Sequence, residues 1–140
     1  MTNSDTAAPA HLGLIAFLLL VWHGVLATDY IVVRFGLGLE LPSLTLAMES
    51  GAVWARIGWA LGVWLGLIAA IFAMMRDDAS VLIFFAAFLG FVAAVLGAEM
   101  AGLPAELLGL PRHGVLGLLV LVPLIGWIYT RSMKRAGVLH

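Results

Sequence analysis

Four long apolar stretches constrain this chain more than any other feature of its sequence. They cover approximately residues 12–33, 53–75, 80–99 and 114–130. A helix needs roughly 20 predominantly apolar residues to cross a hydrocarbon core about 30 Å thick, and each stretch comes close to that length. The sequence therefore predicts an all-α polytopic membrane protein, a four-transmembrane-helix bundle with a single membrane domain over residues 1–140.

The composition agrees with a membrane protein and excludes several functions. Of 140 residues, 64% are hydrophobic and 11% are charged, whereas soluble domains carry about 25% charged residues. The formal net charge of −1 offers no basic field for nucleic acid, so we expect no nucleic-acid partner. The chain has no cysteine and contains no phosphate loop, zinc motif or nucleophile elbow. We therefore expect a protein that is not an enzyme and carries no cofactor.

The connections between the apolar stretches differ in length and character. The segment 35–51 contains Gly36, Gly38, Pro42 and two glutamates among spaced leucines, so we expect an interfacial helix or a short lid there. The second and third stretches are joined by a turn so short that they must be antiparallel neighbours. The third connection, 100–113, contains two prolines and is expected to be an extracytoplasmic loop.

Basic residues near the ends of the stretches predict the orientation in the membrane. One side would hold Arg76, Arg131, Lys134 and Arg135, and the other Arg34, Arg56 and Arg112. Because cytoplasmic ends carry the excess of Lys and Arg, we expect both termini to be cytoplasmic. The first ten residues contain no Lys or Arg, so the first stretch is interpreted as a retained anchor and not a cleaved signal peptide.

Small residues recur at four-residue spacing in the two central stretches. They are Gly58, Gly62 and Gly66 in the second stretch, and Ala86, Gly90, Ala94 and Ala98 in the third. Small residues allow the backbones of membrane helices to approach closely. The two stripes could form one internal seam or face a second copy of the protein. The short turn between the stretches favours the internal seam.

Four ionisable residues fall inside the apolar stretches: His23, Asp29, Arg56 and Glu99. Such residues are costly in a bilayer and are candidates for function by default. Asp29 and Arg56 lie at matching depths, so we predict that they pair. Together with Glu99, to which the sequence assigns no partner, they could form a polar pocket that opens outward. The alternative, a structural ion pair near the interface, is the favoured interpretation.

His23 lies near the middle of the first stretch and admits three interpretations. It could relay protons, bind haem, or be a neutral imidazole bonded to a backbone carbonyl or another polar group. Haem would require a second ligand at similar depth, and His113 lies near the outer end of the fourth stretch. The structural interpretation is therefore favoured, with the relay as its alternative.

Three segments of the chain carry a resemblance to a known family. They are LLLVWHGVLATDY, MESGAVWARIGWALGVWLG and IYTRSMKRAGVL. Together they resemble a family of short bacterial membrane proteins with four spans, often labelled sugar transporters. The resemblance implies four helices, the bacterial inner membrane and transport of a small solute. In that family an asparagine commonly follows the tryptophan of the first segment, where this chain has His23.

Two functions remain open from the sequence. The first is transport of a small solute by an oligomer in which Asp29, Arg56 and Glu99 line a path or site. The second is a non-catalytic accessory or assembly subunit of a larger membrane complex. An outward polar cavity reached by the ionisable residues would favour transport, whereas a solid bundle with an exposed stripe of small residues would favour the accessory role.

Overall fold

A computed structural model describes residues 9–38 and 42–140 of the chain. The elements in these ranges are the helices α1 (Ala10–Arg34), α2 (Leu44–Glu49), α3 (Val53–Met74), α4 (Ala79–Ala101) and α5 (Arg112–Arg135), and the strands β1 (Glu106–Leu107) and β2 (Leu110–Pro111). The four helices other than α2 are long and apolar enough to cross a membrane. The predicted all-α bundle with four membrane-spanning helices is therefore confirmed.

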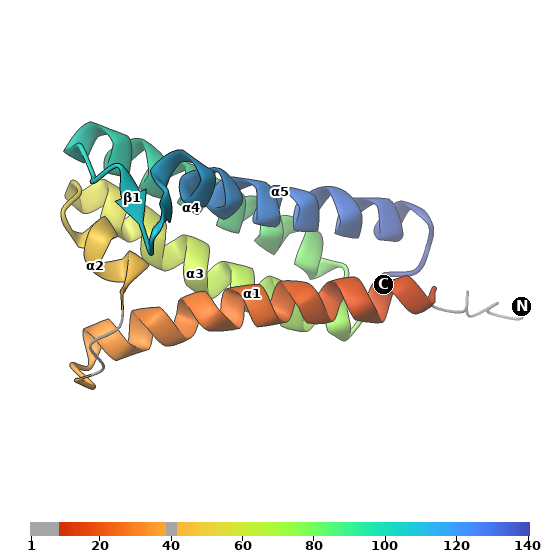
Figure 1. The fold of residues 1–140 in the computed structure, drawn as a ribbon. Helices are drawn as coiled ribbons and strands as arrows, with labels where there is room; N and C mark the ends of the chain where they lie inside the picture. The colour runs from red at the N-terminus through yellow and green to blue at the C-terminus, as the bar shows by residue number, and fades with distance from the viewer. Residues whose placement is uncertain (1–8, 39–41) are drawn as a thin grey trace, which may run out of the picture.

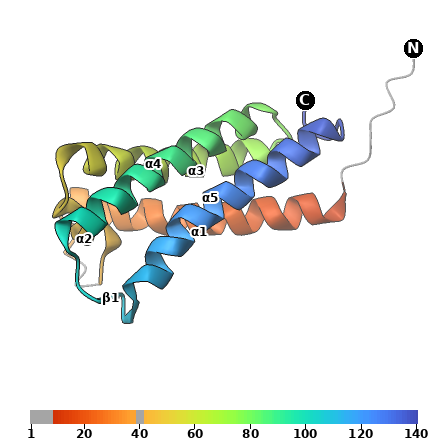
Figure 2. The ribbon, with the colours of Figure 1, turned by 90° about the horizontal axis from the view of Figure 1, so that it is seen from above.

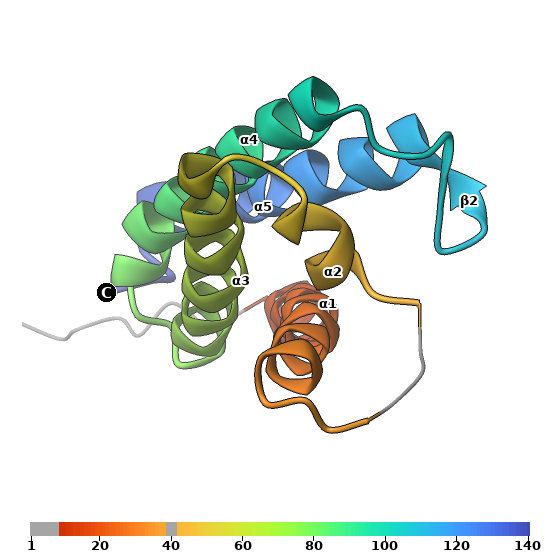
Figure 3. The same ribbon diagram turned by 90° about the vertical axis from the view of Figure 1, so that its left-hand side faces the viewer.

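The four spanning helices pack in the order α1, α3, α4 and α5, so α3 and α4 each have two main neighbours. Helix α3 packs against α1 on one side and α4 on the other, and α4 packs in turn against α5 (Figure 3). Helix α1 begins and α5 ends at the same end of the bundle, called here the terminal end (Figure 1). The short helix α2 and the β1–β2 hairpin lie at the opposite end, called the distal end (Figure 2).

Helix α5 is longer at its C-terminal end than the predicted stretch 114–130. The apolar pattern stops there, but the helix continues through the basic residues Arg131, Lys134 and Arg135. Long basic side chains near the end of a membrane helix extend toward the headgroups, so the backbone can stay helical where apolar residues stop. The helix ends at Arg135, Ala136 caps it, and Gly137 takes the left-handed conformation with φ 71°.

The predicted internal seam between the two small-residue stripes is confirmed at Gly58 and Gly62, whereas Gly66 faces His23 of α1 and lies outside the seam. A methyl group at Gly58 would lie 2.7 Å from the carbonyl oxygen of Gly90, and one at Gly90 would lie 2.7 Å from the amide nitrogen of Gly62. Each distance runs from the added carbon to a backbone atom of the other helix, so no side chain could move aside to make room. This part of the glycine stripe is therefore used between α3 and α4 and is not open to a second copy.

The predicted interfacial helix is α2, which occupies the later part of the segment 35–51. It begins after Ser43, whose hydroxyl accepts a hydrogen bond from the amide of Leu46 at 3.3 Å. Residues 39–41 of the predicted segment lie outside the described residues, as do residues 1–8, where the predicted cytoplasmic N-terminus falls. In the connection 100–113, Leu107 pairs with Leu110 in the β1–β2 hairpin.

The chain folds back at the terminal end after α5. Val138 and Leu139 are 5% and 4% exposed and pack with Leu12 at the start of α1. Arg76, in the turn between α3 and α4, donates from Nε to the carbonyl oxygen of Val138 at 3.2 Å. Its own carbonyl accepts from the amide of His140 at 3.0 Å. These contacts hold together the ends of the four spanning helices, because Arg76 lies in the turn that joins α3 to α4.

Candidate functional site

A half-buried carboxylate, Asp29 of α1, anchors the start of α2. Its Oδ2 atom accepts hydrogen bonds from the amide of Thr45 at 2.8 Å and from the hydroxyl of the same residue at 2.7 Å. The first amides of a helix have no partner within the helix, and the helix dipole favours a negative charge there. Asp29 therefore satisfies a free amide of α2 and fixes α2 against α1.

The same hydroxyl continues the network into α3. Thr45 Oγ1 accepts a hydrogen bond from the indole nitrogen of Trp59 at 3.0 Å, and the two residues are 1% and 2% exposed. One buried hydroxyl thus links three helices, because it donates to Asp29 and accepts from Trp59. We call Asp29, Thr45 and Trp59 the distal network.

The predicted pair between Asp29 and Arg56 is not formed. Ion pairs within the described residues join Arg34 to Glu49, Glu99 to Arg112 and to His113, and Asp78 to Lys134. Arg56 is exposed at the surface of the bundle, while Asp29 faces α2. Helical rise gives the depth of each side chain in the membrane. It does not give the direction in which the side chain points around its helix axis.

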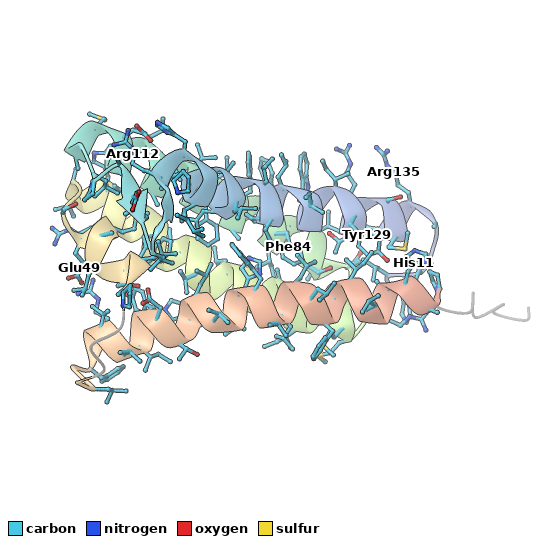
Figure 4. The ribbon with its side chains drawn as sticks, viewed as in Figure 1. His11, Glu49, Phe84, Arg112, Tyr129 and Arg135 are labelled. Carbon is cyan, nitrogen blue, oxygen red and sulfur yellow. The ribbon has the colours of Figure 1, made fainter. Side chains whose placement is uncertain are left out.

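Glu99 has the partners that the sequence could not assign. Its Oε2 lies 3.5 Å from a terminal nitrogen of Arg112, and its Oε1 lies 3.4 Å from Nδ1 of His113. Arg112 also donates to the carbonyl oxygen of Leu103 at 2.6 Å. Arg112 lies at the distal end, where α5 begins (Figure 4). Glu99 therefore ties the end of α4 to the start of α5 and shares no contact with Asp29.

We expect Glu99→Gln to lower the free energy of unfolding by less than about 1 kcal/mol. The side chains of Glu99, Arg112 and His113 are 38%, 21% and 77% exposed, so solvent screens the pairs that the substitution removes. Thermal unfolding in mild detergent at low and high salt would test this. The difference from the wild type should shrink as salt rises, and a large loss that is independent of salt would contradict the assignment.

His23 is fully buried at the centre of the bundle. Its Nδ1 lies 2.8 Å from the carbonyl oxygen of Leu19 on the same helix, so Nδ1 carries the hydrogen and donates it. The rings of Phe84 and Phe91 lie 5.9 and 6.2 Å away, and Figure 4 shows Phe84 in the middle of the bundle. Of the interpretations drawn from the sequence, this geometry matches an imidazole bonded to a backbone carbonyl.

The other ring nitrogen of His23 has no hydrogen-bond partner among the described residues. The imidazole lies against α3 at Gly66, where a methyl group would overlap its Cδ2 and Nε2 atoms. The described residues also contain no group of three or more His, Asp and Glu side chains placed to hold a metal ion. The sequence predicted that His23 lies near the middle of its span, but it did not identify Gly66 as the neighbour of the imidazole.

A cavity of about 730 Å³ lies beside the distal network, on the side of α1 that faces away from the other spanning helices. Its described lining comes only from α1, the connection after it and the start of α2: Val21, Gly24, Val25, Thr28, Asp29, Val32, Val33, Gly36, Gly38, Pro42, Ser43 and Leu46. Asp29 is the single charged residue among these. The described part of the wall is therefore apolar and carries one carboxylate.

The four predicted site residues do not form one site. Asp29 lines the cavity, whereas His23 is in the bundle centre, Arg56 is on its surface and Glu99 is in a separate ion cluster. Sequence reasoning missed Thr45, the hydroxyl that holds Asp29 in place. The available signal was a threonine two residues after a helix-capping serine in the segment 35–51.

Comparison with known proteins places the chain in no established group: no protein family model, no curated protein and no solved structure matches it.

Proposed function

We propose that the protein is an oligomeric membrane carrier for a small solute, which binds in the cavity beside Asp29. The cavity is the observation that carries this proposal. It offers about 730 Å³, within the range of sites that hold small molecules, and its wall combines apolar side chains with few polar groups. Oδ2 of Asp29 accepts two hydrogen bonds from Thr45, whereas Oδ1 has no hydrogen-bond partner among the described residues.

The chemistry of the cavity wall favours a neutral or cationic solute. A carboxylate accepts hydrogen bonds, so it suits the hydroxyl groups of a polyol or the ammonium group of an amine. An anionic solute would be repelled by Asp29, and the described lining holds no basic residue to compensate. The family resemblance, which implies a sugar transporter, agrees with the polyol.

The shape of the cavity favours an oligomer. Its described lining comes only from α1, the connection after it and the start of α2. A solute bound there would therefore stay exposed until another surface covered the cavity. The centre of the bundle offers no alternative route, because His23, Trp59, Phe84 and Phe91 are between 0% and 2% exposed. A second copy of the chain that packs against α1 would close the cavity.

The membrane and orientation belong to the same proposal. We place the protein in the bacterial inner membrane with the terminal end in the cytoplasm. Four basic residues lie at or near the terminal end and three near the distal end, and the basic excess marks the cytoplasmic side. The cavity and Asp29 would then open toward the extracytoplasmic side.

A second candidate function is that of a non-catalytic accessory subunit in a larger membrane complex. The filled bundle centre favours it, because a subunit that only packs needs no path for a solute. In this case a helix of the partner protein, and not a solute, would cover the apolar cavity beside α1.

Ligand-dependent stabilisation distinguishes these functions. The oligomeric mass is measured first in mild detergent, and the same sample is screened by thermal shift against monosaccharides, small amines and small organic acids. We expect a homo-oligomer whose unfolding temperature rises with a monosaccharide or an amine but not with an acid. In Asp29→Asn, which keeps an acceptor for Thr45 but loses the charge, the rise should disappear.

Two variants control for nonspecific effects. Gly24→Phe should abolish the ligand-dependent rise in unfolding temperature, because its ring would fill the cavity. The substitution should be tolerated, since a Cβ atom at Gly24 meets nothing within 4 Å. Arg56→Gln changes a charge outside the cavity and should leave the rise intact. A monomer that responds to no compound, or one that copurifies with a larger complex, would contradict the carrier and support the accessory subunit.

A further inference from the structure

A second recess lies at the terminal end, between α4 and α5. It measures about 370 Å³ and is lined by Asp78, Ala79, Val81, Leu82, Phe85, Trp127 and Lys134. The residues Val81, Leu82, Phe85 and Trp127 are apolar and belong to spanning helices, so this part of the recess opens onto lipid. We call it the α4–α5 groove. It is separate from the cavity at Asp29.

Basic side chains continue the line of the groove toward the membrane surface. Arg131 follows Trp127 at four-residue spacing, which places the two residues on neighbouring positions of one face of α5, and Arg135 lies one turn further toward the terminal end. The guanidinium of Arg131 lies over the Trp127 ring, 5.6 Å from its centroid. Figure 4 shows Arg135 pointing away from the bundle at the terminal end. Beyond its apolar floor the groove is followed along α5 by Arg131 and Arg135, which we call its cationic mouth.

The acidic side chains described near the mouth already have partners in an ion pair or a hydrogen bond. Asp78 Oδ2 pairs with Lys134 Nζ at 2.7 Å, and Asp77 Oδ1 accepts from the amide of Ala79 at 2.8 Å. Neither Arg131 nor Arg135 forms an ion pair with an acidic residue among those described. Their two positive charges are therefore available to an anion that arrives from the membrane.

We propose that the α4–α5 groove is a binding site for an anionic phospholipid of the leaflet at the terminal end. One acyl chain would lie along Leu82, Phe85 and Trp127, and the phosphate would lie between Arg131 and Arg135. The apolar floor and the cationic mouth match the two parts of such a lipid in the order in which a bilayer presents them. This proposal is independent of the carrier function.

The lipid is identified by retention in native mass spectrometry after exchange into nanodiscs of phosphatidylglycerol, phosphatidylcholine or an equal mixture. We expect one phosphatidylglycerol per chain to be retained preferentially from the mixture. Each basic residue near the surface contributes about 1 kcal/mol to the attraction, which is about fivefold in affinity. Arg131→Gln should therefore weaken retention of phosphatidylglycerol about fivefold, and Arg131→Gln with Arg135→Gln about 25-fold.

The control variants separate the groove from general electrostatic attraction. Arg56→Gln removes an exposed arginine that also lacks an ion pair among the described residues, but it lies at the distal end and should leave retention unchanged. Ala79→Phe keeps every charge and fills the groove, so it should displace the lipid. Soluble glycerophosphoglycerol should not compete, because it has no acyl chain.

Three outcomes would overturn the proposal. The first is equal retention of the two phospholipids. The second is an equal loss in Arg56→Gln and Arg131→Gln, which would mean that only the overall charge matters. The third is competition by glycerophosphoglycerol, which would assign the mouth to a free phosphate ester. If Arg131→Gln fails to fold, Ala79→Phe still tests the groove.

Discussion

Gly66→Ala is expected to destabilise the bundle by about 3 kcal/mol or more. Gly66 of α3 lies against His23 of α1, and an added methyl group would overlap two atoms of the imidazole. The ring cannot swing away easily, because it is fully buried, its Nδ1 donates a hydrogen bond to the carbonyl of Leu19, and the Phe84 ring packs against it with centroids 5.9 Å apart. The helices would have to separate. Thermal or denaturant unfolding in mild detergent measures the loss.

The double variant His23→Ala with Gly66→Ala tests whether the clash is the cause. Removing the imidazole leaves space that the new methyl group can enter, so the two substitutions together should cost at least about 1 kcal/mol less than their sum. Gly117→Ala is the matched control, since Gly117 lies inside α5 and a Cβ atom there meets nothing within 4 Å. Additive losses would show that His23 and Gly66 do not contact each other.

The position of Gly66 shows what a stripe of small residues does and does not specify. The stripe from Gly58 to Gly66 predicted one seam with α4, and Gly58 and Gly62 do meet α4 there. Eight residues of an α-helix make more than two turns, so Gly66 is rotated by roughly 80° from Gly58. Since α3 lies between α4 and α1, that rotation turns Gly66 from the first neighbour toward the second.

The fold could be predicted because it depends on lengths and apolar character, which the sequence displays directly. The four spanning helices and the antiparallel turn at residues 76–79 follow from those features. The candidate site depends on the direction in which each side chain faces, and that is decided by helix packing. Asp29 and Arg56 lie at similar depths, yet Asp29 faces the short helix α2, whose position no apolar pattern revealed.

Thr45→Val is expected to lower the free energy of unfolding by about 2 to 3 kcal/mol. The substitution keeps the shape of the side chain but removes the hydroxyl that joins Asp29 to Trp59. The indole nitrogen would then be buried without an acceptor, and Asp29 would keep only the amide of residue 45. Unfolding in mild detergent gives the loss, and Thr28→Val gives the baseline, because that exposed hydroxyl bonds only to Gly24 of its own helix.

Trp59→Phe in the Thr45→Val background isolates the indole. Phenylalanine has no N–H to satisfy, so the double variant should lose less stability than the sum of the two single variants. A loss of stability in Thr45→Val as small as in Thr28→Val would mean that the distal network does not hold α2.

Thr45→Val also tests the carrier function, because Thr45 orients the carboxylate that lines the cavity. If that orientation matters, Thr45→Val should weaken ligand-dependent stabilisation although Asp29 itself is unchanged.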